Sequence, residues 1–211
     1  MPEELSGKED PTVFIAVLAA GGSNRFGRSK QLEDFEGRPL VRRAAELARS
    51  VCGDRNVLLV GHESAAVVAA AGDASRYLVV NERYEEGLGG SIALAARSLS
   101  HVADAVLLLF VDQPLITARH LRELIDTWSG ADSEIVATAF SGTLGPPVLF
   151  PRGAFAALSG LSGDEGARSV LRDPQFDVRT VPFEDAAIDI DTPTDLERIA
   201  HESRQGAPRP K

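Results

Sequence analysis

Short apolar runs alternate with amphipathic stretches along most of the chain. Runs rich in β-branched and aliphatic residues predict strands, and stretches with apolar residues at helical spacing predict helices. The predicted strands cover 13–18, 56–60, 76–80, 105–111, 134–139, 143–150 and 178–181. The predicted helices cover 39–49, 64–71, 91–100 and 117–128, and a further helix begins after Thr192. Because strand and helix alternate regularly in the first half, we expect parallel βαβ units with helices on both faces of a twisted sheet.

The two ends of the chain differ from the region between them. Residues 1–11 and 202–211 are polar and rich in charge, glycine and proline, so we expect flexible tails there. Residues 12–201 then form the folded region. The length of 211 residues fits one domain of moderate size, or at most two small ones. With 44% hydrophobic residues, the chain can bury a sizeable core without disulfides or a structural metal.

Charge and cysteine content narrow the class of protein. The formal net charge is −9, with 31 acidic and 22 basic residues, which disfavours nucleic acid and anionic membrane as partners. No apolar run is long enough to span a bilayer, and the acidic N-terminus is unlike a signal peptide. Since Cys52 is the only cysteine, no internal disulfide can form, and we expect a reducing, cytoplasmic setting.

A glycine-rich loop follows the first predicted strand, at the edge of a parallel sheet where ligands bind. It reads Leu18-Ala-Ala-Gly-Gly-Ser-Asn-Arg-Phe-Gly-Arg-Ser-Lys30. Small residues let backbone amides approach phosphate oxygens closely. Arg25, Arg28 and Lys30 add three cations to an otherwise acidic protein. The loop therefore predicts a polyphosphate-binding site.

A P-loop is an alternative explanation of these residues. Residues 22–29 nearly fit the pattern G-x-x-x-x-G-K-[ST], and 106–112 could serve as its Walker-B strand. However, Arg28 stands where the pattern has lysine, and arginine is a poor replacement at a place where the ammonium must reach the β- and γ-phosphates. The dinucleotide fingerprint G-x-G-x-x-G is absent.

Three aspartates have the chemistry of cation ligands. Asp112 follows the most apolar predicted strand, and a carboxylate there is costly unless it is paired or binds a metal. Asp189 and Asp191 flank Ile190, so an extended backbone would turn both carboxylates to one side, a good arrangement for a hard cation. The alternatives are a turn at Asp112 and helix capping beside Asp191.

Several motifs, taken in order, resemble a known family. The glycine-rich loop is similar to the signature L-A-[AG]-G-x-S-x-R-M-G-x-x-K of the MobA-like NTP transferases, with Phe26 in place of the methionine. The resemblance continues through Gly37-Arg-Pro-Leu40, Asn81, Gly87-x-x-x-Ser91, Asp112-Gln-Pro114, Gly145-x-Pro147-x-x-Phe150, Gly163-Asp-x-Gly-Ala-Arg168 and Asp189-Ile-Asp-Thr-Pro-x-Asp195. Within this family, the loop, the Asp112 motif and the segment 163–168 are most similar to molybdenum cofactor cytidylyltransferases.

The resemblance implies a single Rossmann-like α/β domain that uses magnesium and a nucleoside triphosphate. It implies catalytic roles for Arg25, Lys30 and Asp112, and magnesium binding by Asp112 with Asp189, Asp191 or both. The implied nucleotide-binding residues are Leu18, Ala19, Ala20, Gly21, Gly22, Ser23, Arg25, Lys30, Asn81, Gly90 and Ser91. The implied acceptor-binding residues are Gln113, Pro114 and Arg168.

The function that the resemblance implies is transfer of CMP from CTP to the terminal phosphate of a molybdopterin-type cofactor, with release of pyrophosphate. A molybdoenzyme or a cofactor chaperone would be a further partner. Three alternatives remain at this point: a transferase of the same family that uses GTP or another phosphate acceptor, an NAD(P)H oxidoreductase of the nicotine-blue type, and a nucleotide-binding module without catalysis.

Overall fold

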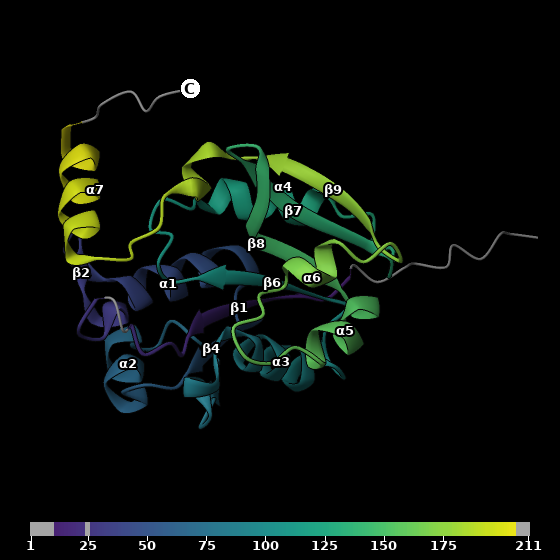
Figure 1. Ribbon diagram of the computed structural model, residues 1–211, viewed down its shortest axis with the longest axis horizontal. Coiled ribbons are helices and arrows are strands. Elements are labelled where there is room, and N and C mark those ends of the chain that lie inside the picture. The colour runs from purple at the N-terminus through teal and green to yellow at the C-terminus, as the bar shows by residue number, and fades with distance from the viewer. Residues whose placement is uncertain (1–10, 24–25, 206–211) are drawn as a thin grey trace, which may run out of the picture.

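The computed structural model describes residues 11–23 and 26–205, with side chains through 203, and it has one central sheet (Figure 1). Its strands are β1 (Val13–Ala19), β4 (Asn56–Val60), β5 (Tyr77–Val80), β6 (Ala105–Phe110), β7 (Glu134–Phe140), β8 (Thr143–Pro151) and β9 (Asp177–Pro182). Their order in space is β5-β4-β1-β6-β8-β7-β9. Only β8 in this sheet runs antiparallel to its neighbours, so the expectation of a mostly parallel sheet is confirmed.

Helices cover both faces of this sheet. One face carries α1 (Leu40–Cys52), α2 (Ser64–Ala71) and α4 (Ala118–Thr127), and the other carries α3 (Leu88–Leu99), α5 (Phe155–Ser159) and α6 (Arg168–Leu171). Short 3-10 helices lie at η1 (Lys30–Leu32), η2 (Tyr84–Glu86), η3 (Arg152–Ala154) and η4 (Glu184–Ala187). Among the described residues, no helix is both long and apolar enough to cross a membrane.

Strand β1 shows why the sheet is buried on both faces. All seven of its residues are buried, and alternate side chains enter opposite cores. Ile15 and Val17 pack on the α1 side, whereas Phe14 and Ala16 pack on the α3 side. Because side chains alternate along a strand, a continuous apolar run is what a central parallel strand needs.

A smaller cluster supports the C-terminal helix α7 (Pro193–Gln205) beside the hairpin of β2 (Asp34–Phe35) and β3 (Arg38–Pro39) (Figure 1). Its buried members are Phe26, Phe35, Leu40, Ile190 and Ile199. Thr192 and Asp195 cap α7 reciprocally: the Thr192 hydroxyl donates to Asp195 Oδ2 at 2.7 Å, and the Asp195 amide donates back at 3.2 Å. The predicted helix start is therefore confirmed.

Two predicted boundaries differ from the structure. Helix α3 begins at Leu88 rather than Ser91. The residue before Leu88, Gly87, has φ +108°, a backbone conformation outside the helical region, so the helix starts directly after it. Ser91 therefore lies inside the first turn instead of capping it. Helix α7 continues to Gln205, past the predicted domain end at 201, so part of the expected tail is helical. The expected N-terminal tail lies almost entirely outside the described residues.

Candidate active site

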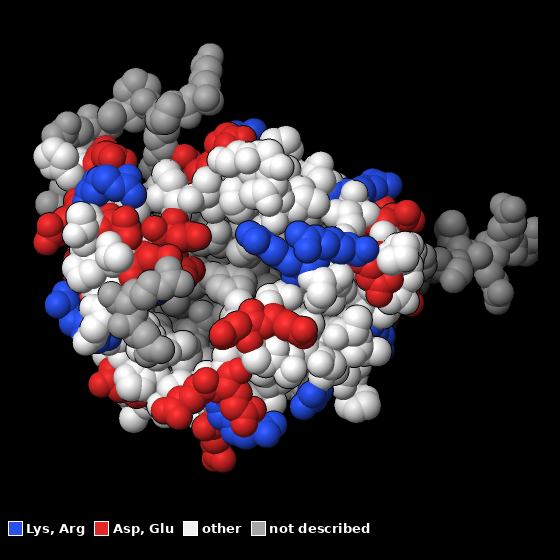
Figure 2. All heavy atoms as spheres, in the orientation of Figure 1, with Lys and Arg blue, Asp and Glu red and all other residues white. Residues whose placement is uncertain are grey.

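A cavity of about 680 Å³ opens where β1 and β6 end, at the carboxyl edge of the parallel strands. It is lined by Leu18, Ala19, Ala20, Gly21, Gly22, Ser23, Phe26, Lys30, Gln31, His62, Tyr84, Glu85, Gly87, Leu88, Ser91, Phe110, Val111, Asp112, Asp164 and Asp191. The structure thus brings ten of the predicted site residues to one cavity: all six from Leu18 to Ser23, with Lys30, Ser91, Asp112 and Asp191. Figure 2 shows the hollow with acidic side chains on its rim and basic side chains across α6.

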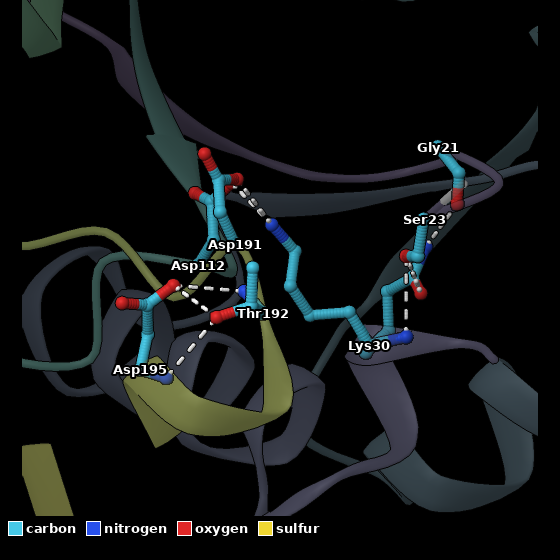
Figure 3. A network of polar contacts seen from close by, with 8 residues as sticks. Gly21, Ser23, Lys30, Asp112, Asp191, Thr192 and Asp195 are labelled. Carbon is cyan, nitrogen blue, oxygen red and sulfur yellow. Dashed lines mark hydrogen bonds and ion pairs between the residues drawn. The ribbon is translucent and has the colours of Figure 1, made fainter. Parts of the chain in front are cut away.

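Lys30 lies between two carboxylates that come from distant parts of the chain. Its Nζ is 3.0 Å from Asp112 Oδ2 and 3.4 Å from Asp191 Oδ1 (Figure 3). The Lys30 side chain is 12% exposed, against 26% for Asp112 and 50% for Asp191, so the lysine is the most enclosed of the three. Because little water screens an ammonium enclosed in this way, it attracts anions more strongly than an exposed ammonium does.

The segment that carries Asp189 and Asp191 is tied to the end of β6. The backbone amide of Ile190 donates to the Asp112 carbonyl at 2.9 Å, and the Ile190 side chain is fully buried beneath α7. This inward side chain leaves its two neighbours on the other side of an extended backbone. Asp191 reaches Lys30 beside Asp112, and Asp189 is close enough to Asp112 and Asp191 for their charges to act on it.

The carboxyl group of Asp189 is affected by this crowding. Desolvation, and then the negative charges of Asp112 and Asp191, raise its pKa to about 6, while Lys30 and a hydrogen bond from Gln113 act in the opposite direction. The residue as a whole is exposed and does not line the cavity. Lys30 thus contacts two carboxylates, those of Asp112 and Asp191, and Asp189 is a third acidic group near them.

This donor set suits a divalent cation that binds together with a substrate. Among the side chains that the structure describes, no three from His, Cys, Asp and Glu are arranged to hold a metal alone. Mg²⁺ in proteins commonly takes one or two carboxylates and completes its shell with phosphate oxygens and water. The pair Asp112 and Asp191, bridged here by the Lys30 ammonium, meets that requirement.

Gln31 shapes the glycine-rich loop and was not singled out by the sequence analysis. It is 2% exposed, and its Nε2 donates to the carbonyls of Ala19 at 3.1 Å and Gly21 at 2.5 Å. Its Oε1 accepts from Ser23 Oγ at 3.2 Å. Ser23 Oγ in turn accepts the Lys30 amide at 3.1 Å (Figure 3). The residue type alone does not show that Gln31 is buried, so the sequence holds no signal of this role; once buried, the side chain needs hydrogen-bond partners and finds them in the loop.

The end of β4 braces the same loop. The His62 amide donates to the Ala20 carbonyl at 3.1 Å. A Cβ on Gly61 would lie 2.8 Å from that carbonyl oxygen and 2.5 Å from Tyr84 Cβ, so only glycine fits there. Ser29 hydrogen-bonds the carboxylate of Glu63, which closes the loop against the start of α2. His62 and Tyr84, with ring centroids 5.6 Å apart, form an aromatic wall of the cavity.

Asn81 and Gly90 do not line this cavity, although the sequence analysis assigns them to nucleotide binding. Both line a neighbouring cavity of about 480 Å³. The buried Asn81 donates from Nδ2 to Ser91 Oγ at 3.0 Å and accepts the Arg83 amide at 3.0 Å. In this arrangement Asn81 positions Ser91 rather than reaching the cavity itself.

The predicted acceptor-binding residues also lie elsewhere. Gln113 is 5% exposed, and its Nε2 donates to the carbonyls of Pro146 at 3.2 Å and Ala186 at 2.9 Å, so its amide holds the Asp112 loop in place. With Pro114 it lines a separate cavity of about 300 Å³ beside α1. Arg168 is exposed at the start of α6, outside the main cavity. Arg25, a predicted catalytic residue, lies outside the described residues.

The fold and the site define a nucleoside-triphosphate transferase architecture, and comparison with known families agrees. A model of the MobA-like NTP transferase domain matches residues 15–180. The chain therefore belongs to the MobA-like NTP transferase family.

Two characterised relatives and one solved structure are similar over nearly their whole lengths. The purine catabolism protein PucB of Bacillus subtilis (strain 168) is 30% identical over 90% of this chain and 96% of its own. The nicotine blue oxidoreductase of Paenarthrobacter nicotinovorans is 32% identical over 90% of this chain and 97% of its own. The crystal structure of Rv0371C from Mycobacterium tuberculosis H37Rv in complex with manganese has 27% identity and a TM-score of 0.74, and covers 90% of this chain and 98% of that one.

Proposed function

We propose that this protein transfers CMP from CTP to the terminal phosphate of a molybdopterin-type acceptor, in the cytoplasm, and releases pyrophosphate. An oxygen of the acceptor phosphate attacks the α-phosphorus of CTP and forms a new P–O–P linkage. The bond between the α-phosphorus and the bridging oxygen to the β-phosphate breaks, and the electron pair leaves with pyrophosphate.

The observation that carries this proposal is the position of Lys30. Its ammonium sits at the carboxyl edge of the sheet, at one end of the glycine-rich loop and in contact with Asp112 and Asp191. Negative charge grows on the leaving pyrophosphate during nucleotidyl transfer, and a fixed, poorly hydrated cation stabilises that charge without reorganisation. Backbone groups of 18–23, held by Gln31, would orient the triphosphate.

Magnesium is part of the proposal. Asp112 and Asp191 are the residues that would hold it, with Asp189 beside them as a further carboxylate. When bound, the ion would neutralise phosphate charge and orient the reacting groups. Lys30 would then exchange its carboxylate partners for phosphate oxygens, since the same ammonium cannot serve both fully.

The choice of CTP and of the acceptor rests on the resemblance to cytidylyltransferases. Ala19 and Ala20 in the loop, and the Asp112-Gln-Pro114 motif, belong to that likeness. His62 and Tyr84, whose ring planes lie at 56° to each other, offer aromatic surface against which a base would pack. An oxidoreductase of the nicotine-blue type is not favoured, because a lysine that contacts two carboxylates beside a glycine-rich loop suits phosphates and a cation rather than hydride transfer.

The experiment is product analysis with the purified protein. It is incubated with each of the four nucleoside triphosphates, Mg²⁺ and molybdopterin, and the product is identified by mass while pyrophosphate is quantified. We expect a cytidine dinucleotide and one pyrophosphate for each product. Nucleotide binding without pyrophosphate would identify a non-catalytic module, product from GTP alone would identify a guanylyltransferase, and NADPH oxidation with a dye acceptor would identify an oxidoreductase.

A further inference from the structure

Strand β5 forms one edge of the sheet and is unusually apolar for an edge. It reads Tyr-Leu-Val-Val, and Tyr77, Leu78 and Val80 are 52%, 50% and 46% exposed. It pairs with β4 on its inner side, and among the residues that the structure describes no strand pairs with its outer side. Natural edge strands usually carry charges, proline or bulges that prevent pairing with another strand. Within β5 itself there is none of these.

The opposite edge of the same sheet is protected in the usual way. Strand β9 ends in Pro182, and its exposed side chains include Asp177, Arg179 and Thr180. A proline cannot donate to a ladder, and charges resist the approach of another strand. The two edge strands of the sheet thus differ. β9 carries features that hinder pairing with another strand, whereas β5 lacks them and is suited to such pairing.

The backbone of β5 fixes which groups are available for pairing. The Asn81 amide donates to the Val60 carbonyl at 2.7 Å, and Val60 lies beside Val80 in the parallel register. Since backbone groups alternate in direction along a strand, the amides and carbonyls of Leu78 and Val80 point away from β4. These are the groups that a further strand would meet.

We propose that a second copy of this chain pairs with β5 across a two-fold axis at Val79, which makes the protein a dimer with one continuous sheet. In this antiparallel arrangement, Leu78 of each copy lies opposite Val80 of the other, and these residues exchange both of their backbone hydrogen bonds. Val79 faces its own counterpart across the axis. The interface is isologous, as a two-fold dimer requires.

Charge complementarity favours a second copy over another partner. Arg76 lies in the bend just before β5 and Glu82 in the turn just after it, and both residues are exposed. Because the two copies of β5 run antiparallel, the basic end of each strand lies beside the acidic end of the other, and the symmetry creates this contact twice.

The interface would also reach the candidate active site through the chain itself. Asn81 follows β5 directly, and η2 then supplies Tyr84 and Glu85 to the cavity. The dimer interface would therefore lie next to the segment that carries the wall of the cavity.

The first test is the oligomeric state of the full chain, measured by sedimentation velocity over a range of concentrations. We expect a dimer for the wild type, and a dissociation constant at least about tenfold higher for Leu78→Lys. Val102→Lys is the matched control, because Val102 is 54% exposed and lies after α3, away from β5. A folded wild type that is monomeric at every concentration, or equal effects of the two lysines, would overturn the proposal.

The second test addresses the register. Arg76→Glu and Glu82→Arg should each weaken the dimer, and the double variant should restore it, because the reversed charges again face each other. In Val79→Cys, oxidation should produce a covalent dimer, since opposed residues of a non-hydrogen-bonded pair lie about 4.5 Å apart between Cα atoms, within disulfide range. On denaturing electrophoresis without a reducing agent, Val102→Cys should run as a monomer. Failure of both the rescue and the cross-link would exclude this two-fold pairing.

Discussion

Gly87 lies directly against the backbone of Gly163. A Cβ on Gly87 would come within 2.3 Å of the Gly163 carbonyl oxygen, and the Gly89 amide donates to that same oxygen at 2.9 Å. A Cβ on Gly89 would lie 2.7 Å from Ser162 backbone atoms. Two glycine-rich motifs far apart in the sequence therefore meet at the start of α3, beside the cavity. Ser91 and Asp164, which follow these glycines in the sequence, both line the cavity.

The first prediction concerns this contact. Gly87→Ala should destabilise the fold by roughly 2 kcal/mol or more, because Gly87 has φ +108° and no space for a methyl group. Chemical denaturation measures the change. Gly90→Ala is the matched control, since the nearest atom to its Cβ would be Asn81 Nδ2 at 3.8 Å. Similar stability of the two variants would show that the 162–163 segment moves away freely.

Gln31 provides the second prediction. Gln31→Glu should lower the stability of the fold more than Gln31→Ala, because a carboxylate would face the Ala19 and Gly21 carbonyls in place of a hydrogen-bond donor. Loss of a buried donor commonly costs about 1–3 kcal/mol, and more for a buried charge. Thermal unfolding with and without nucleotide measures both the stability and the binding. A Gln31→Glu variant as stable as the wild type would mean that the loop does not depend on this amide.

The third prediction tests Lys30. Lys30→Ala should lower turnover by about 10²–10³ with little loss of stability, because it removes a cation that acts mainly in the transition state. Arg28→Ala is the control from the same loop. Its guanidinium is exposed and pairs with Glu33, at 2.7 Å between Nη2 and Oε2. Equal turnover in Lys30→Ala and the wild type would remove Lys30 from the mechanism.

The fourth prediction separates the three aspartates. Asp112→Asn should weaken Mg²⁺ binding sharply, and high Mg²⁺ should partly restore activity. Asp191→Asn should have the next largest effect, because Asp191 shares Lys30 with Asp112 and lines the cavity, whereas Asp189 does not line it. Isothermal titration of Mg²⁺ with a non-hydrolysable CTP analogue tests the order. Unchanged affinity in Asp112→Asn would exclude this carboxylate as a ligand.

The fifth prediction concerns pH and the buried His120. Its Nε2 lies 2.8 Å from Thr138 Oγ1, and the Thr138 hydroxyl donates to the Pro147 carbonyl at 2.7 Å. Nε2 must therefore donate, and Nδ1 is buried without a hydrogen-bond partner. The Phe183 ring stacks on the His120 imidazole, with 4.4 Å between the two ring centroids. Burial of this neutral ring lowers the pKa of His120 from 6.5 to about 4.

The sign of the pH effect follows from that pKa. Between pH 6.5 and about 4, the unfolded chain binds a proton at His120 and the folded protein does not, so stability falls as pH falls. The loss should reach at most about 3 kcal/mol and stop below pH 4. His120→Gln should flatten this slope, and His101→Gln, at an exposed position, should leave it unchanged. Urea denaturation from pH 7 to 4 measures the three slopes.

The course of the chain through the sheet was predictable from local patterns. Runs such as 13–18 and 105–111 are almost entirely apolar, and only a strand covered on both faces can bury every residue of such a run. The helix that begins at Pro193 was predictable because the Thr192 cap and the Asp195 carboxylate lie within one turn of each other. In both cases the determining interactions are short-range in sequence.

The tertiary structure alone decided which residues act together. Lys30 and Asp191 are 161 positions apart, and no local pattern indicates that their side chains meet. Gln31 and Asn81 act through backbone and hydroxyl groups, so their residue types did not reveal whether they face the cavity or support it. Gly87, which precedes α3, packs on Gly163, a contact that arises only after the two segments have folded against each other. The sequence determined the elements because periodicity and capping are local, while the site depended on long-range packing, which brings its residues together.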